Sequence, residues 1–110
     1  MKDYYNLFVQ LSLQLCFEND YADKSKVKKH NKASAELGRL RDEMINFVGE
    51  ETWRKLLNHS DDRVKINAVS ACLKYGVLVD ESFLVLKNII NNSDDSTIRF
   101  SARMLLQKYK

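Results

Sequence analysis

The sequence contains no proline and only three glycines among its 110 residues. Average usage of about 5% proline and about 7% glycine would supply several of each. Sandwiches and barrels of β-strands need many turns rich in these residues, so their scarcity excludes an all-β fold. Collagen-like and low-complexity disordered chains are rich in them too, and they are excluded on the same ground. The composition therefore predicts an all-α protein.

Thiols and long apolar runs are also scarce. The two cysteines, Cys16 and Cys72, lie in apolar helical patterns with no short spacing between them. We expect two buried thiols, no disulfide and a reducing compartment. No run reaches the roughly 18 apolar residues of a membrane-spanning helix. The apolar segment 7–17 contains polar residues, and no small-residue cleavage site follows it, so it does not fit a signal peptide. The sequence predicts a soluble cytoplasmic protein that does not contact a membrane.

Length and charge set further limits. The length suits one domain, and a chain of this size can bury a core without disulfides or metals. The net charge of +3 and the pI near 8.9 reflect a small excess of Lys and Arg. Nucleic-acid-binding domains often have a pI above about 9 with clustered positive charge. Overall charge therefore leaves both protein and nucleic-acid partners open.

Periodic apolar residues and capping signals predict six helices. The first, over 3–18, is apolar around most of its circumference, so we expect it to be buried on several sides or to pair with a second copy. Gly38 lies inside the second, where we expect another helix to pack closely. Trp53, on the short third helix, is expected to join the core. The other expected bounds are about 22–48, 50–58, 60–76, 80 onward, and 93–109.

An internal repeat is the strongest pattern. Segment 56–62 reads Leu-Leu-Asn-His-Ser-Asp-Asp and aligns with 89–95, Ile-Ile-Asn-Asn-Ser-Asp-Asp, at an offset of 33 residues. The apolar stripes that follow align at an offset of 34, so we place one inserted residue near Thr97. The second half of the chain thus holds two copies of helix, acidic turn, helix. The aligned stripes are Val64, Ala68, Ala71 and Tyr75, and Ile98, Ala102, Leu105 and Tyr109.

The two copies differ on one face. An internal repeat buries two sides because it has a neighbour on each, whereas a terminal repeat has a polar outer face. The helix of the first copy carries a second apolar stripe, and the helix of the second copy is mostly polar there. The pattern predicts that the last helix closes the stack. The aligned residues are Ile66, Val69 and Leu73, and Phe100, Arg103 and Gln107.

The first copy carries Leu57, Asp61, Val64-Lys65, Ala68 and Leu73, and the second keeps Ile90, Asp94, Ile98-Arg99 and Ala102. These residues resemble the HEAT repeat pattern, in which Asp precedes Val-Arg or Val-Lys and then a spaced Ala and Leu. The whole chain also resembles a group of short bacterial HEAT-like domains of unknown function, which have a long second helix containing Asn, here around 30–32.

The resemblance implies a small α-solenoid of HEAT-like or armadillo type, a right-handed superhelix of about six helices. Residues 1–48 would form an N-terminal helix pair, 49–76 a first repeat, and 80–110 a second repeat with a C-terminal cap. Lys65 and Arg99 occupy the family's basic position, where such a residue commonly bonds a turn Asp, here Asp61 or Asp94. The resemblance implies a binding role, and fold alone does not determine function.

Catalytic and metal-binding motifs are lacking. The acidic pairs at 61–62, 80–81 and 94–95 each lie at a helix start, where capping accounts for them. His30 and His59 have no neighbouring His or Cys ligand at helical spacing. The glycines stand alone, so there is no phosphate-binding loop, and there is no nucleophile elbow. We expect a protein that is not an enzyme and has no cofactor or metal.

Two basic features are candidate binding surfaces. A narrow polar stripe on the fourth helix carries cations and no carboxylate, and its counterpart on the sixth is Thr97, Ser101, Met104 and Lys108. In an α-solenoid the second helix of each pair lines the concave surface, which is the usual binding surface. Lysines at 24, 28 and 32 form a strip that is either electropositive and functional or a solvated face. The candidate residues are Arg63, Asn67, Ser70, Lys74, Ser101, Lys108, Lys24, Lys28 and Lys32.

We therefore expect a non-enzymatic module that binds another protein with an acidic surface through its concave face. Bacterial adaptors and immunity proteins that neutralise a toxin are both consistent with this reading. The alternative is nucleic-acid binding along the lysine strip and the basic concave residues. Against it stand the low net charge and the lack of aromatic residues among the lysines, since single-strand binders stack bases on aromatic rings. A homodimer through the first helix is a third interpretation.

Overall fold

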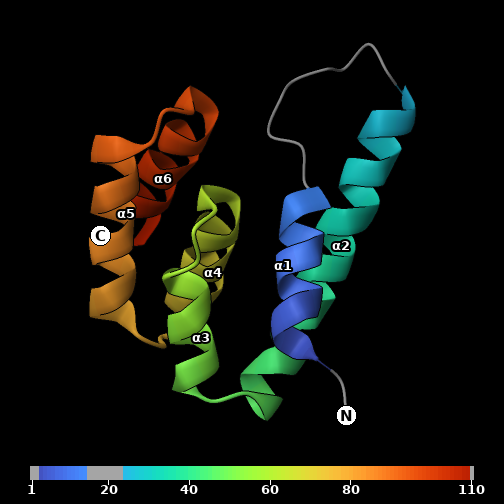
Figure 1. The fold of residues 1–110 in the computed structure, drawn as a ribbon, viewed down its shortest axis with the longest axis horizontal. Helices are drawn as coiled ribbons and strands as arrows, with labels where there is room; N and C mark the ends of the chain where they lie inside the picture. The colour runs from blue at the N-terminus through green and yellow to red at the C-terminus, as the bar shows by residue number, and fades with distance from the viewer. Residues whose placement is uncertain (1–2, 15–23, 110) are drawn as a thin grey trace.

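Six α-helices lie within residues 3–14 and 24–109, the ranges that the computed structural model describes (Figure 1). Side chains are described over 3–14 and 34–109. Neither range contains a strand, so the predicted all-α class is confirmed. The predicted continuation of the first helix to residue 18, with Cys16, lies outside these ranges. The helices are α1 (Tyr4–Gln14), α2 (Lys24–Phe47), α3 (Glu50–Leu57), α4 (Asp62–Tyr75), α5 (Val79–Asn92) and α6 (Ser96–Tyr109).

The acidic turns start α4 and α6 by capping them. Asp61 Oδ1 accepts a hydrogen bond from the backbone N–H of Arg63 at 2.9 Å. Asp95 Oδ1 accepts from the N–H groups of Thr97 and Ile98, at 2.9 and 3.2 Å. Each carboxylate satisfies N–H groups that have no partner inside their helix. The prediction that acidic residues cap the helices is confirmed at these two turns.

These caps also show where the second copy has its extra residue. The sequence alignment pairs Asp61 with Asp94 and puts the insertion near Thr97. In the structure the cap equivalent to Asp61 is Asp95, so the offset of 34 already applies at the turn. The extra residue lies before the cap, because α5 continues to Asn92 whereas α3 ends at Leu57. The predicted position is wrong because two adjacent acids in each turn hide which one forms the cap.

Helices adjacent in the sequence form three pairs, α1/α2, α3/α4 and α5/α6, which lie side by side in that order (Figure 1). The central element is α4, which packs against α1, α3, α5 and α6. Contacts of α3 with α5, and of α4 with α6, place corresponding helices of the last two pairs next to each other. Packing of α1 on α2, α3 and α4 buries Phe8 fully and leaves the other apolar residues of this helix half-buried or exposed.

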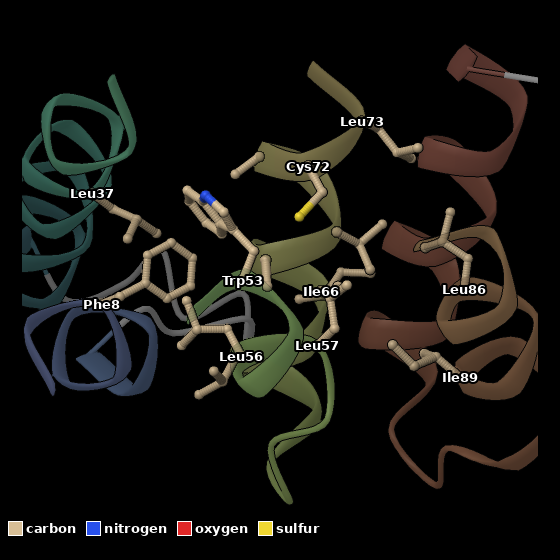
Figure 2. Packing of buried hydrophobic residues seen from close by; sticks show 14 of the residues in the cluster. Phe8, Leu37, Trp53, Leu56, Leu57, Ile66, Cys72, Leu73, Leu86 and Ile89 are labelled. Carbon is tan, nitrogen blue, oxygen red and sulfur yellow. The ribbon is translucent and has the colours of Figure 1, made fainter. Parts of the chain in front are cut away.

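The hydrophobic core is centred on Trp53, which is 1% exposed. Its ring meets that of Phe8 edge to face, with centroids 5.8 Å apart and an interplanar angle of 88°, a favourable aromatic arrangement. Figure 2 shows Phe8 and Leu37 approaching Trp53 from one side, and Leu86 and Ile89 on the far side of α4. The predicted core role of Trp53 is confirmed.

Both apolar stripes of α4 are buried, whereas α6 buries only one. Ile66 and Leu73 of the second stripe are 3% and 7% exposed. Leu73 points from α4 toward α6 (Figure 2), so this stripe faces the last helix pair. The equivalent residue to Ile66 on α6 is Phe100, which is 62% exposed. The predicted difference between the copies is confirmed, but the outer face of α6 carries a large exposed aromatic residue rather than only polar ones.

Gly38 lies in a helix interior where, among the described residues, no atom of another helix comes within 4 Å of the place a Cβ would take. A Cβ atom built there would meet only Arg41 Nη2, at 3.9 Å, so the predicted close packing at this glycine is wrong. Glycine is less favourable than alanine inside a helix by about 0.8–1.0 kcal/mol. We therefore expect Gly38→Ala to raise the free energy of unfolding by about 0.5–1 kcal/mol in a urea titration.

Gly76→Ala is the matched contrast for this prediction. Gly76 ends α4 with φ of 70°, in the left-handed region that a Cβ atom disfavours by about 1–2 kcal/mol. The same titration should show a loss of about 1 kcal/mol for this variant. Equal effects of the two substitutions would contradict the assignment of Gly38 to an unobstructed helix interior.

Candidate binding surface

The polar stripe of α4 lies along the junction with α2. Ser70 Oγ accepts a hydrogen bond from Arg41 Nη1 at 3.3 Å. One turn further on, Lys74 Nζ lies 3.7 Å from Asp42 Oδ1. Both contacts join α4 to the C-terminal half of α2. Ser70 and Lys74, predicted as partner-binding residues, therefore bridge two helices of their own chain.

Arg63 stands at the other end of this stripe and is held by Asp61. Its Nη2 and Nε atoms donate to the two carboxylate oxygens at 2.9 and 3.1 Å, and Nη1 donates to the carbonyl oxygen of Leu13 at 3.3 Å. Such forked pairs are the stronger kind of charge-assisted hydrogen bond. The α4 stripe itself contains no carboxylate, as its sequence shows, but Asp61 and Asp42 pair with its two cations. The partner acids come from a turn and from α2, which the periodicity of α4 alone does not reveal.

Two buried donors complete the junction between α2 and α4. Asn67 Nδ2 and Arg41 Nε have no hydrogen-bond partner and are inaccessible to solvent. Asn67 lies one helical turn before Ser70 on α4. Arg41 reaches the same part of α4 from α2 through its hydrogen bond to Ser70. Sequence reasoning missed Arg41, because its role depends on how α2 packs against α4 and no local signal distinguishes it from other charged residues of α2. The structure thus brings together a polar interhelical junction rather than an open groove.

Lys65 and Arg99 bond differently from the ladder that the resemblance implies. Lys65 Nζ lies 3.8 Å from Asp62 Oδ1. Arg99 Nη1 donates to the carbonyl oxygen of Ser93 at 2.8 Å. Neither makes the expected bond to Asp61 or Asp94, and Arg63 holds Asp61 instead. Lys65 therefore pairs within the first turn of α4, and Arg99 joins α6 to the turn before it.

The carboxyl of Asp61 gives the fold a specific pH dependence. The hydrogen bond from the Arg63 guanidinium holds the pKa of Asp61 below its ordinary range. A carboxyl whose pKa is lower in the folded state than in the unfolded state stabilises the fold at pH values above its unfolded-state pKa, which is near 4. This stabilisation is lost as the pH falls through the folded-state pKa. Asp61→Asn keeps a capping oxygen but removes the charge. We expect the variant to be less stable by about 0.5–1 kcal/mol at pH 7, and we expect this difference to shrink as the pH falls toward 2. Urea titrations at both pH values test this, and a pH-independent difference would contradict it.

The lysine strip lies on the first turns of α2, which begins at Lys24. Lys24, Lys28 and Lys32 therefore share one side of a continuous helix by their spacing. Their side chains, and that of His30, lie outside the described residues. The strip remains a prediction about helix register.

The exposed side of α6 is the most distinctive open surface. We call it the α6 face and define it by Phe100, Arg103, Met104, Gln107 and Lys108, all of which are exposed. Phe100 is 62% and Met104 is 51% exposed, and they lie one helical turn apart. The α6 face includes the predicted residue Lys108. Ser101, also predicted, is half-buried at its edge.

The α6 face combines apolar area with positive charge. The helix contains Arg99, Arg103 and Lys108 and no Asp or Glu. Within the described part of the chain, no carboxylate forms an ion pair with Arg103 or Lys108. In contrast, the cations of α4 are matched by Asp61, Asp62 and Asp42. Among the side chains that the structure describes, the α6 face thus has the cationic, carboxylate-free character that the sequence assigned to the α4 stripe.

The titratable side chains elsewhere are structural. Burial raises the pKa of the Cys72 thiol to about 11, so this cysteine is inert at neutral pH. His59 Nδ1 accepts a hydrogen bond from the backbone N–H of Asp61 at 3.0 Å. Among the described residues, no three His, Cys, Asp or Glu side chains gather closely enough to hold a metal ion. In the same part of the chain, no helix has the length and apolarity needed to cross a membrane.

Comparisons with protein-family models, with curated proteins and with solved structures found no significant match.

Proposed function

We propose that this chain is a non-enzymatic protein-binding module, arranged as a short HEAT-like helical stack, and that the α6 face holds its partner. The observation that carries the proposal is the exposure of Phe100 and Met104 on a helix that contains cations and no carboxylate. Aromatic residues, Met and Arg are enriched in protein interfaces, and the strongest contributors cluster at their centres. An exposed Phe–Met pair beside Arg103 has this composition.

The repeat supports the same surface. The position of Phe100 on α6 corresponds to that of Ile66 on α4, which is buried where α4 faces the α5/α6 pair. The side of α4 that carries Ile66 contacts further helices of the chain. The equivalent side of α6, which carries Phe100, is therefore suited to pack against another helix. On α6 it is open. A partner helix that packs there would repeat a contact that this chain already makes internally.

Charge defines the kind of partner. Arg103 and Lys108 border the apolar centre of the α6 face, and no acid on the helix offsets them. A partner segment with apolar residues flanked by Asp or Glu complements this surface, whereas a basic segment is repelled. We infer an acidic, amphipathic partner. Recognition by adaptors and by immunity-type proteins works through such complementarity, with no chemistry on the bound protein.

The test is affinity capture from cells of the source organism with three forms of the chain. The double variant Phe100→Ser/Met104→Ser removes the apolar centre, and Leu84→Ser removes a residue on α5 that is 66% exposed and lies outside the α6 face. We expect one acidic protein to bind the wild type and Leu84→Ser equally, and to bind the double variant about 100-fold more weakly. A captured protein that binds all three forms equally would overturn the proposal.

Nucleic-acid binding is the second candidate, favoured by one observation. Because α2 is helical from Lys24 onward, the lysine strip lies on one side of a rigid element. Fluorescence anisotropy with an oligonucleotide of mixed sequence tests it at several salt concentrations. This function predicts a steep fall of log K with log salt, and its loss in the triple variant with Glu at 24, 28 and 32. Binding that is unaffected by these substitutions would exclude the strip.

A further inference from the structure

A hollow of about 460 Å³ opens where the start of α1 meets the junction of α2 and α3. The rings of Tyr4, Tyr5 and Phe47 line it, together with Asp3 and Thr52. The Tyr4 and Phe47 rings are nearly parallel, with an angle of 7° between planes and centroids 6.1 Å apart. Aromatic side chains from two helices thus form one side of the hollow.

The two stacked rings differ in how they are held. Tyr4 is anchored, because its hydroxyl donates a hydrogen bond to Glu43 Oε1 at 2.9 Å. Burial raises the pKa of this hydroxyl, and the bond to Glu43 raises it further, so the ring stays neutral at physiological pH. Phe47 is 70% exposed, the largest exposed fraction among the large apolar residues of the described chain. Its burial therefore contributes little to folding, and its ring is open to a ligand.

Charge around the hollow is negative. Among the residues that the structure describes, its lining includes the carboxylate of Asp3 and no Lys, Arg or His. Glu43 lies next to Tyr4, and Glu50 and Glu51 form the first turn of α3 directly after the lining residue Gly49. Aromatic ring faces add partial negative charge of their own. A cation is therefore attracted to the hollow, and an anion is repelled.

The hydrogen-bonding groups narrow the class of cation. A guanidinium or a primary ammonium group carries several N–H donors, each of which needs an acceptor once it leaves water. Here Asp3 is the one charged acceptor among the described lining residues, and each of its oxygens already accepts one hydrogen bond from Asn6, at 3.1 Å from the backbone N–H and 2.6 Å from the side-chain amide, which leaves few free lone pairs for several N–H donors. A quaternary ammonium group has no N–H donor and is bound by aromatic faces through cation–π attraction. We propose that this aromatic hollow binds a quaternary ammonium group.

Choline is the probe, and its neutral isostere 3,3-dimethylbutan-1-ol is the chemical control. Both are titrated into ¹⁵N-labelled protein at constant ionic strength, with the backbone amides of Gly49 and Thr52 as reporters. We expect saturating shifts for choline, with a dissociation constant on the order of millimolar. The isostere should bind at least about ten-fold more weakly, because it has the same shape and no charge. N-acetyl-trimethyllysine amide is titrated in parallel. The ratio of its affinity to that of choline distinguishes a trimethylated lysine side chain of a partner from a free small molecule as the ligand.

Two variants locate the site on the surface. Phe47→Ala removes one ring and should weaken choline binding about five-fold, whereas Phe100→Ala, an equally exposed aromatic truncation on α6, should leave it unchanged. Because both residues are exposed, both variants remain folded, which their amide spectra verify. Equal binding of choline and its isostere, an unchanged affinity in Phe47→Ala, or no saturation up to about 100 mM would each overturn the proposal. None of these outcomes bears on the α6 face, so the two proposals fail separately.

Discussion

Replacing Trp53 with alanine is expected to lower the free energy of unfolding by about 3–5 kcal/mol. Trp53 is 1% exposed, and its ring packs edge to face on Phe8 at the centre of the core. Removing it deletes contacts to several helices at once and leaves a cavity. Because domains of this size are stable by about 5–15 kcal/mol, the loss is a large share of the total. The variant should be barely folded at 37 °C.

Far-UV circular dichroism in a thermal scan measures this effect, since the variant has no tryptophan fluorescence. We expect the midpoint to fall by about 10 °C or more. Phe47→Ala is the matched control, because it truncates an aromatic residue that is 70% exposed, and it should change stability by less than about 0.5 kcal/mol. Trp53→Phe should cost far less than Trp53→Ala, because it fills most of the space and removes an indole N–H that has no partner. Similar losses for Phe47→Ala and Trp53→Ala would contradict the described core.

The second large effect compares equivalent positions of the two repeat copies. Ile66→Ala should destabilise the fold by about 2–4 kcal/mol, because Ile66 is 3% exposed on the side of α4 that faces the last helix pair. Phe100→Ala at the matching position of α6 should change stability by less than about 0.5 kcal/mol, because Phe100 is 62% exposed.

Urea titrations of both variants decide this comparison. Phe100→Ala removes a larger side chain than Ile66→Ala does. Side-chain size alone therefore predicts the larger loss of stability at position 100, which is the opposite of the expected result. A loss at Phe100 that equals the loss at Ile66 would mean that the outer side of α6 is covered, for example by a second copy. Repeating the titration at several protein concentrations separates that case, since a dimer becomes more stable at higher concentration.

The helices and their caps could be predicted because their causes are local. Apolar residues at helical spacing and an acid before each helix act within a few residues of the chain, which is why Asp61 appears as a cap in both sequence and structure. The two apolar stripes of α4 could also be predicted from helical spacing. The second stripe, with Ile66 and Leu73, indicated that α4 has a neighbour on each side, and both residues are buried. Even here the sequence could not show that Asp95 rather than Asp94 caps α6.

The candidate surfaces were predicted less well because they depend on contacts between distant segments. The periodic pattern of α4 showed no acidic partner for Lys74. In the structure its ammonium group pairs with Asp42, which lies 32 positions earlier in the chain. Arg41 reaches Ser70 in the same way. The hollow beside Phe47 depends on where the start of α1 meets the end of α2, and no helical period describes that junction. Local patterns predict what each helix presents, and only packing decides which side stays open.

Thiol labelling tests most directly whether the α6 face is open. Phe100→Cys and Ile66→Cys are each made in a Cys16→Ser background, in which Cys72 stays silent because it is buried with its pKa raised to about 11. The account predicts that the new thiol at position 100 reacts with a soluble maleimide at nearly the rate of a free cysteine. The thiol at position 66 should react at least about 100-fold more slowly, because it is reached only through opening of the core. Slow labelling at both positions would contradict the open binding surface on α6.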